Sequence, residues 1–255
     1  MNGFESGGHK FGKKYPLWEI LDCAAREGFD GVELVQAWPQ GPYPAGNETE
    51  RIRALKRMYD QYGLRIFSIQ NMADGAFDPS ADVRRNWFDL ARDRAAFASA
   101  VGCAHMGFWP GGDLRGQTLD AALYPLSEPF REANTIIADH GMVAGFEIEP
   151  PFVFQSEEHM LRIMAGSGIK AIYDPNHCDL FNGSTGRPHE VLQRLGVKNI
   201  AYVHLTDTDG TLGDNGTSKH LPVGDGHSII AESLRVLREG GFDGWIIMDG
   251  WEVPD

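Results

Sequence analysis

The stretch GMVAGFEIEP, residues 141–150, contains the pattern that decides the fold. A glycine precedes an apolar run, Met142 to Ile148, which has the length of a buried strand and is short for a helix. Near the end of this run lies an acidic residue, Glu147. Three later stretches repeat the order of apolar run and then metal-binding side chain: YDPNHCDL with Asp174, YVHLTDTD with His204 and WIIMDGWE with Asp249.

Segments with the period of an amphipathic helix separate these runs, at residues 157–165, 189–195 and 229–239. The same alternation extends toward the N-terminus, with predicted helices at 16–27, 48–62, 81–101 and 119–140 and predicted strands at 31–35, 65–70 and 104–108. Strands that alternate with helices are parallel, because a helix is the usual crossover between them. In a closed parallel barrel the C-terminal strand ends meet at one mouth, so four side chains far apart in sequence can surround one ion.

The alternation predicts an α/β fold, a (β/α)8 TIM barrel, and a single domain over residues 1–255, because no linker-like stretch divides the chain. Seven strands are readable. The opening stretch, Met1 to Gly7, is the candidate for the eighth, although it is polar and glycine-rich. No room for a helix follows the last strand. We therefore expect the first strand and the last helix to be weak or trimmed.

Composition narrows the class of function. The net charge of -13 argues against binding to nucleic acid, and no apolar run approaches the ~18 residues of a membrane span. The three cysteines have no CxxC spacing, so a disulfide framework is not expected. No basic and then apolar signal opens the chain, which makes a cytoplasmic enzyme the default expectation.

The four strand-end residues predict a divalent metal site. Two or three carboxylates with one imidazole suit Mn2+, Mg2+, Co2+ or Zn2+, and the absence of cysteine argues against a closed structural zinc site. Any one acid at a strand end is more often a helix cap or a salt-bridge partner. Four such residues ending four consecutive strands are harder to explain that way, because the carboxylates among them would repel one another at one barrel mouth unless a cation neutralised them. Glu149 competes with Glu147, since alternation puts both on one face.

Two further polar residues follow the candidate ligands. His177, three residues after Asp174, is expected to bind substrate or support a ligand, with an ordinary surface histidine as the alternative. Asp207, three residues after His204, either orients that imidazole or caps the following turn.

Six blocks in one order resemble the sugar phosphate isomerase/epimerase family, the xylose isomerase-like TIM barrel group that includes ketose 3-epimerases, hydroxypyruvate isomerase, inosose-processing enzymes and endonuclease IV. The blocks are FDGVEL (29–34), GMVAGFEIEP (141–150), YDPNH (173–177), VHLTD (203–207), HLPVGDGH (220–227) and GFDGWIIMD (241–249). The resemblance covers nearly the whole chain. It is specific for fold and metal site and not for substrate.

The resemblance implies that Glu147, Asp174, His204 and Asp249 bind one metal ion per chain, with Mn2+ the first choice, and that Glu147 and Asp249 form the acid/base pair. Asp249 departs from the glutamate of the epimerases and is one methylene shorter. The early glutamate of the family corresponds to Glu33, which either binds substrate hydroxyls or simply closes its strand. The epimerases carry an arginine after the metal-binding histidine, where this chain offers Lys219 and His220.

Aromatic residues near strand ends could form apolar walls against a sugar ring, and ordinary packing explains them about as well. They are Trp38, Phe108, Trp109 and Trp251.

The implied reaction is proton transfer at a carbon next to a carbonyl, through an enediolate, on a sugar, keto-sugar or polyol. Return of the proton to the opposite face gives an epimer, and return to the neighbouring carbon gives an isomer. Loss of a β-oxygen would instead make the protein a dehydratase or lyase. An endonuclease IV-like hydrolase, drawing on His105, His177 and His227, and a non-catalytic sugar-binding barrel are the rival classes. A homo-oligomer is compatible with the sequence, which shows no interface.

Overall fold

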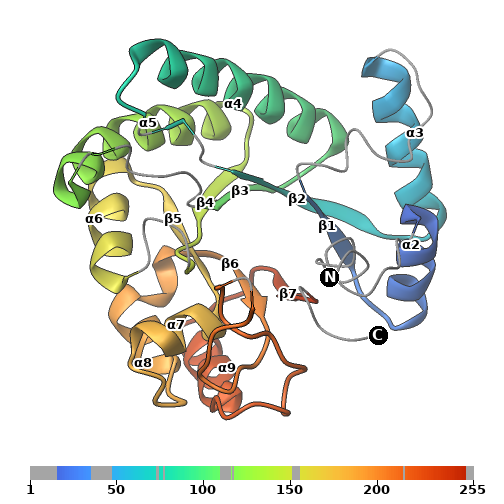
Figure 1. The fold of residues 1–255 in the computed structure, drawn as a ribbon. Coiled ribbons are helices and arrows are strands. Elements are labelled where there is room, and N and C mark those ends of the chain that lie inside the picture. The colour runs from blue at the N-terminus through green and yellow to red at the C-terminus, as the bar shows by residue number, and fades with distance from the viewer. Residues whose placement is uncertain are drawn as a thin grey trace.

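Seven parallel strands form one sheet in the computed structural model, which describes residues 16–35, 48–72, 75–76, 78–109, 116, 118–150, 156–214 and 216–250. The strands pair in chain order, each with the next. They are β1 (Gly31–Val35), β2 (Arg65–Met72), β3 (His105–Trp109), β4 (Val143–Phe146), β5 (Lys170–Tyr173), β6 (Ile200–Leu205) and β7 (Ile246–Met248). Figure 1 shows the sheet curled into a nearly closed barrel with helices outside it.

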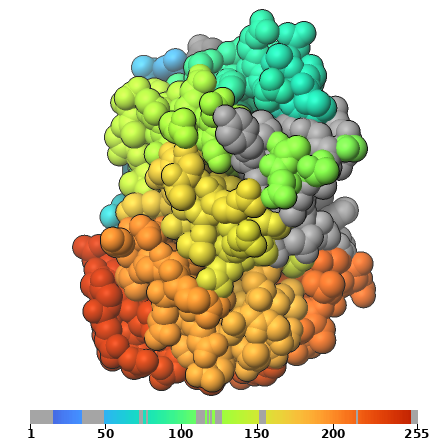
Figure 2. Space-filling view, turned by 90° about the vertical axis from the view of Figure 1, so that its left-hand side faces the viewer, coloured from blue at the N-terminus to red at the C-terminus, as the bar shows by residue number. Residues whose placement is uncertain are grey.

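The helices form the outer layer and follow the strands in chain order, so that successive chain segments cover the side of the barrel in Figure 2. They are α2 (Leu17–Arg26), α3 (Glu48–Gln61), α4 (Ala81–Val101), α5 (Leu119–Asp139), α6 (Glu157–Ser167), α7 (Pro175–Phe181), α8 (His189–Leu195) and α9 (Ile230–Glu239), with a 3-10 turn η2 (Val197–Asn199) before β6. No helix in the described part of the chain is long and apolar enough to cross a bilayer.

The helices form where apolar residues recur with helical period. In α2 the buried side chains are Leu17, Ile20, Leu21 and Ala24, the spacing of one helix face. Helices α4 and α6 end at Gly102 and Gly168, which adopt φ of 93° and 74°. A side chain with a Cβ resists that left-handed conformation, so these glycines stop the helices and release the chain toward the next strand.

The predicted barrel is confirmed. All seven readable strands are present, with ends that differ from the predicted ones by up to two residues. The proposed eighth strand, Met1 to Gly7, lies outside the described residues. Helix α7 was not predicted. It begins at Pro175, directly after Asp174. The Asp174 side chain accepts a hydrogen bond from the backbone N–H of Asn176 and caps the helix.

Side chains close the barrel at its N-terminal end. The Trp245 ring, just before β7, stacks on Phe67 of β2 with 4.7 Å between centroids and an interplanar angle of 20°. The Arg65 guanidinium lies over the same indole at 4.5 Å. Phe67 in turn meets the Tyr202 ring edge-on at 5.7 Å. The residue just before the last strand therefore packs against β2, and Phe67 of β2 packs in turn against Tyr202 of β6.

Between β6 and α9 the chain makes a long excursion, residues 206–229, which returns to the barrel through two antiparallel bridges, Asp207 with Leu221 and Leu212 with Ser218. The Asp207 carboxylate accepts hydrogen bonds from the backbone N–H groups of Thr208, Gly224 and Ser228, at 2.8, 3.0 and 3.1 Å. This one buried carboxylate therefore holds both the start and the end of the excursion.

Candidate metal centre

The strand ladder carries the four predicted ligands to one place at the C-terminal ends of β4, β5, β6 and β7. The Glu147 N–H bonds to the Phe108 carbonyl at 3.0 Å and the Asp249 N–H to the Leu205 carbonyl at 3.1 Å, so both acids continue the ladder past the strand ends. Glu147, Asp174 and His204 are each 1% exposed, and one ligand atom from each lies within 4.8 Å of the others. The structure thus brings the predicted quartet together.

His204 lies between carboxylates on both sides of its ring. Its Nδ1 is 3.0 Å from Oε1 of Glu147 and 3.8 Å from Oδ2 of Asp249, and its Nε2 is 3.0 Å from Oε2 of Glu33. Burial alone would lower the pKa of His204, but the charges of Glu147 and Glu33 overcome that effect and hold the pKa well above its ordinary value. Glu33, predicted to bind substrate or close its strand, is fully buried against this imidazole.

A polar layer that the sequence reading missed supports Glu147 from below. The Gln70 amide donates to Oε2 of Glu147 at 3.1 Å, and the Tyr202 hydroxyl donates to the Gln70 carbonyl oxygen at 2.9 Å. Gly107 makes room for this pair, because a Cβ there would overlap both the Gln70 oxygen and the Tyr202 hydroxyl. The available signal was a polar residue in the middle of a buried strand, SIQNM.

Asp174 has one satisfied oxygen and one without a hydrogen bond. Oδ1 accepts a hydrogen bond from the backbone N–H of Asn176 at 2.7 Å. Oδ2 is buried without a hydrogen-bond partner and lies 3.6 Å from Nε2 of His177. Burial first, and then the charges of Glu147 and Asp249, raise the pKa of Asp174 well above its ordinary value. A buried carboxylate oxygen is costly unless it is paired, and a cation among these carboxylates would pair it. The donor set therefore fits a divalent ion.

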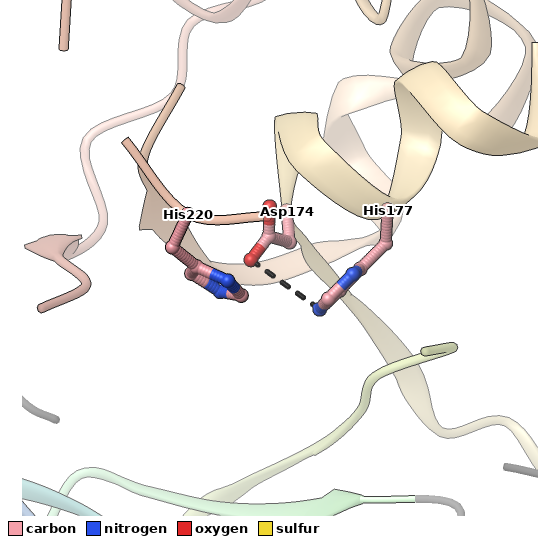
Figure 3. Close-up of side chains that lie close together, drawn as sticks. All are labelled: Asp174, His177 and His220. Carbon is pink, nitrogen blue, oxygen red and sulfur yellow. Dashed lines mark ion pairs between the residues drawn. The ribbon is translucent and has the colours of Figure 1, made fainter. Parts of the chain in front are cut away.

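His177 and His220 converge on Asp174 in Figure 3, and one ligand atom from each of the three residues lies within 4.8 Å of the others. Nε2 of His177 is 4.0 Å from Oε1 of Glu147 and 4.0 Å from Oε1 of Glu149. Nε2 of His220 is 3.9 Å from Oδ2 of Asp249. Both imidazoles are buried at the edge of the predicted quartet.

Glu149 lies beside the quartet and is more exposed than Glu147, with 14% of its side chain accessible. Its Oε1 accepts a hydrogen bond from the Thr217 hydroxyl at 2.6 Å. Burial, and then the charge of Glu147, raise the pKa of Glu149 to about 8 against the opposing effect of the Thr217 hydrogen bond.

Other predicted residues lie elsewhere. The Asp207 carboxylate binds loop backbone, in agreement with its capping alternative, while the His204 nitrogens face Glu147 and Glu33. Trp109 ends β3 and is half-buried, and Phe108 packs against Trp87 and Phe130 in the core. Predicted candidates that lie outside the described residues are Trp38 and Trp251.

Two of the additional histidines, His105 and His227, lie away from the quartet. His105 begins β3, at the opposite end of the barrel from the quartet, and its ring meets Phe67 and Tyr202. His227 is bound through Nε2 to Asp179 at 2.7 Å. Of the three histidines that the hydrolase alternative required, His177 alone lies at the quartet.

The chain is similar to known proteins in sequence and in fold. The sequence profile of the xylose isomerase-like TIM barrel family matches residues 21–255. An uncharacterized protein of Methanocaldococcus jannaschii is 26% identical over 255 residues, covering 94% of this chain and 80% of that protein.

Two solved structures share the fold. The IolI protein with a bound zinc atom has a TM-score of 0.77 at 15% identity, covering 97% of this chain and 87% of that one. D-psicose 3-epimerase of Clostridium cellulolyticum with D-tagatose has a TM-score of 0.74 at 16% identity, covering 92% and 80%. Because the profile spans most of the sequence, the resemblance drawn from six blocks is confirmed, and the chain belongs to the xylose isomerase-like TIM barrel family.

Proposed function

We propose that the protein is a divalent-metal-dependent sugar isomerase or epimerase, with the metal held by Glu147, Asp174, His204 and Asp249. The observation that carries this proposal is the buried Oδ2 of Asp174, which lacks a hydrogen-bond partner in a carboxyl whose pKa is raised by burial and then by the neighbouring carboxylates. Such an arrangement is stable when a cation neutralises it. When bound, a divalent ion orients adjacent oxygens of the substrate and stabilises the negative charge that develops on them.

The residues around the quartet fit the support of metal ligands. Glu33 accepts a hydrogen bond from His204 when Nε2 carries the proton, which leaves Nδ1, the nitrogen facing Glu147 and Asp249, as the ligand atom. The Gln70 amide holds Oε2 of Glu147 and so fixes the direction of its other oxygen. Both supports are fully buried, which keeps the ligand geometry rigid.

Proton transfer would be carried by the first and last members of the quartet. Glu147 would take the proton from the carbon next to the substrate carbonyl, and Asp249 would return a proton to the resulting enediolate. These acids follow β4 and β7, and both lie near Nδ1 of His204, at 3.0 and 3.8 Å. Asp249 lies within 3.8 Å of His204 although it is shorter than the glutamate of the epimerases.

The finer assignments rest on the same site. We take Mn2+ as the first choice of metal, with Mg2+, Co2+ and Zn2+ as alternatives, because carboxylates and one imidazole form a hard to borderline donor set. The substrate would be a sugar, keto-sugar or polyol, in keeping with the D-psicose 3-epimerase that shares the fold. We place the enzyme in the cytoplasm and leave its assembly into a homo-oligomer to measurement.

The proposal is tested by metal analysis of the purified protein together with exchange of substrate hydrogen for deuterium from heavy water. The panel would contain ketoses, inososes and 3-keto-glycosides. We expect about one divalent ion per chain and metal-dependent exchange into one substrate class, which Glu147→Gln abolishes. Glu158→Gln is the matched control, because Glu158 is exposed on α6. A purified protein that binds no divalent metal under any loading condition would refute the assignment of the quartet.

A further inference from the structure

The segment Thr217 to His220 brings side chains from the long excursion onto the metal centre. Three of its four residues, Thr217, Ser218 and His220, are buried. Ser218 is fully buried and His220 is 6% exposed, whereas Lys219 is half-exposed and pairs with Asp209 at 2.6 Å. The segment is held by bonds from the Lys219 N–H to the Thr211 carbonyl and from the Gly213 N–H to the Thr217 carbonyl. Ser218 and His220 therefore face the site from a fixed backbone.

Ser218 contacts both imidazoles that converge on Asp174, through different groups. Its hydroxyl oxygen is 2.7 Å from Nδ1 of His177, and its backbone carbonyl is 2.8 Å from Nδ1 of His220. The two rings stand nearly perpendicular, at 73°, with 5.8 Å between centroids. One residue thus sets the Nδ1 environment of two histidines, and leaves the Nε2 atom of each to face the site.

The proton on His220 follows from its partner. A backbone carbonyl only accepts hydrogen bonds, so Nδ1 of His220 donates. In the neutral ring Nε2 then carries a lone pair, and this atom lies 3.9 Å from Oδ2 of Asp249. His220 therefore offers an acceptor to any ligand at the metal centre.

The proton on His177 follows from its surroundings. In the neutral ring His177 carries one hydrogen, and the partners of its two nitrogens decide which nitrogen holds it. Nε2 faces oxygens of Asp174, Glu147 and Glu149 at 3.6, 4.0 and 4.0 Å. These carboxylate oxygens are hydrogen-bond acceptors, which an N–H matches and a lone pair does not, and this puts the hydrogen on Nε2. Nδ1 then accepts from the Ser218 hydroxyl, which rotates to donate.

We propose that Ser218 is a positioning residue that fixes the two imidazoles in opposite tautomers, so that His177 presents an N–H and His220 presents a lone pair at the metal centre. A sugar hydroxyl both donates and accepts, and it satisfies such a pair in full. An oxygen anion without a hydrogen would leave the His220 lone pair unmatched. The choice of a polyhydroxy compound as the ligand rests on the proposed function. The two tautomers do not depend on the proposed function.

Proton and nitrogen NMR of the metal-free protein, with isotope-labelled histidine, reads the tautomers directly. His177→Gln and His220→Gln assign the signals. We expect the wild type to show the hydrogen of His177 on Nε2 and that of His220 on Nδ1. Ser218→Ala removes the hydroxyl and keeps the carbonyl, so the His177 signals should change while those of His220 stay as an internal control. Ser218→Thr, which keeps a hydroxyl, should restore the wild-type pattern.

A kinetic arm connects the tautomers to the reaction. With the substrate that exchanges fastest in the deuterium assay, we expect Ser218→Ala to lower kcat/KM by about 10-fold, the loss typical of a removed supporting hydrogen bond, and Ser218→Thr to recover most of it. A hydrogen found on Nδ1 of wild-type His177, or His177 signals unaffected by Ser218→Ala, overturns the inference even if the enzyme is active. An inactive wild type with the expected tautomers refutes the proposed function alone. If Ser218→Ala fails to fold, the wild-type spectrum still tests the inference, because it shows which nitrogen of His177 carries the hydrogen.

Discussion

Replacing Gln70 with leucine removes the buried amide that joins Tyr202 to Glu147 while keeping a side chain of similar size. The lost bonds are the 3.1 Å contact to a carboxylate and the 2.9 Å contact from a phenol. A hydrogen bond to a charged group contributes about 1.5–3 kcal/mol and a neutral one about 1 kcal/mol. Leucine offsets part of this through apolar burial, so we expect the free energy of unfolding to fall by about 2 kcal/mol.

Urea unfolding followed by tryptophan fluorescence measures this loss, provided that the slope against urea concentration is unchanged. Domains are stable by about 5–15 kcal/mol, so the variant should fold and its activity can be assayed. Because Glu147 loses one of its supports, we also expect the proton-exchange rate to fall by about 10-fold. Gln193→Leu, on the exposed face of α8, is the matched control. A loss of stability below about 0.5 kcal/mol, the range of ordinary surface changes, would contradict the role given to the amide.

The remaining expectations concern charge, loop and thiols. Asp174→Asn keeps the helix cap but removes a charge that is repelled by its neighbours, so the metal-free protein should unfold at a higher urea concentration. Added metal should no longer raise the melting temperature of this variant. An unchanged metal-dependent rise in melting temperature would show that this carboxylate is not a ligand. Asp207→Ala removes the acceptor of three backbone N–H groups, and each of these hydrogen bonds contributes about 1.5–3 kcal/mol. Limited proteolysis should therefore cut the variant within residues 208–228, whereas the wild type resists. Equal resistance of the two proteins would argue against this anchoring. Burial raises the pKa of the Cys103 and Cys178 thiols. A thiol reagent should therefore label the native protein only at half-buried Cys23, and should label all three cysteines after unfolding. Fast labelling of Cys103 or Cys178 in the native protein would contradict their burial.

Local patterns in the sequence were sufficient to predict the barrel. Helix 81–101 and strands 31–35 and 200–205 have the predicted bounds, because an apolar stripe or run ends there at a glycine or a polar residue. The convergence of the candidate quartet was also predictable, since each member lies at or just past the C-terminal end of its own strand and parallel strands bring these ends to one mouth. Helix α7 was missed although its signal, an aspartate before a proline, was present in YDPNH.

Contacts between distant parts of the chain were not predictable from one sequence. The bond from Tyr202 to Gln70 spans 132 positions and that from His204 to Glu33 spans 171. Which residues face each other across a barrel depends on the stagger of all intervening strands, and local periodicity does not report it. Ser218 was missed for a related reason, because the path of residues 206–229 back to the mouth is set by Asp207 and its three backbone partners.

Because Asp207 anchors that excursion, the residues at the candidate site come from two structurally separate parts of the molecule. The acids and the imidazole proposed for the chemistry are fixed by the sheet, whereas Thr217, Ser218 and His220 arrive on one insertion whose two ends are tied to a single carboxylate. Evolution, or a designer, could replace the residues between the ties and give the barrel a different ligand while leaving its reaction intact. Under the proposed function, substrate recognition by Ser218 and His220 would therefore be separable from the strands that carry the proposed chemistry.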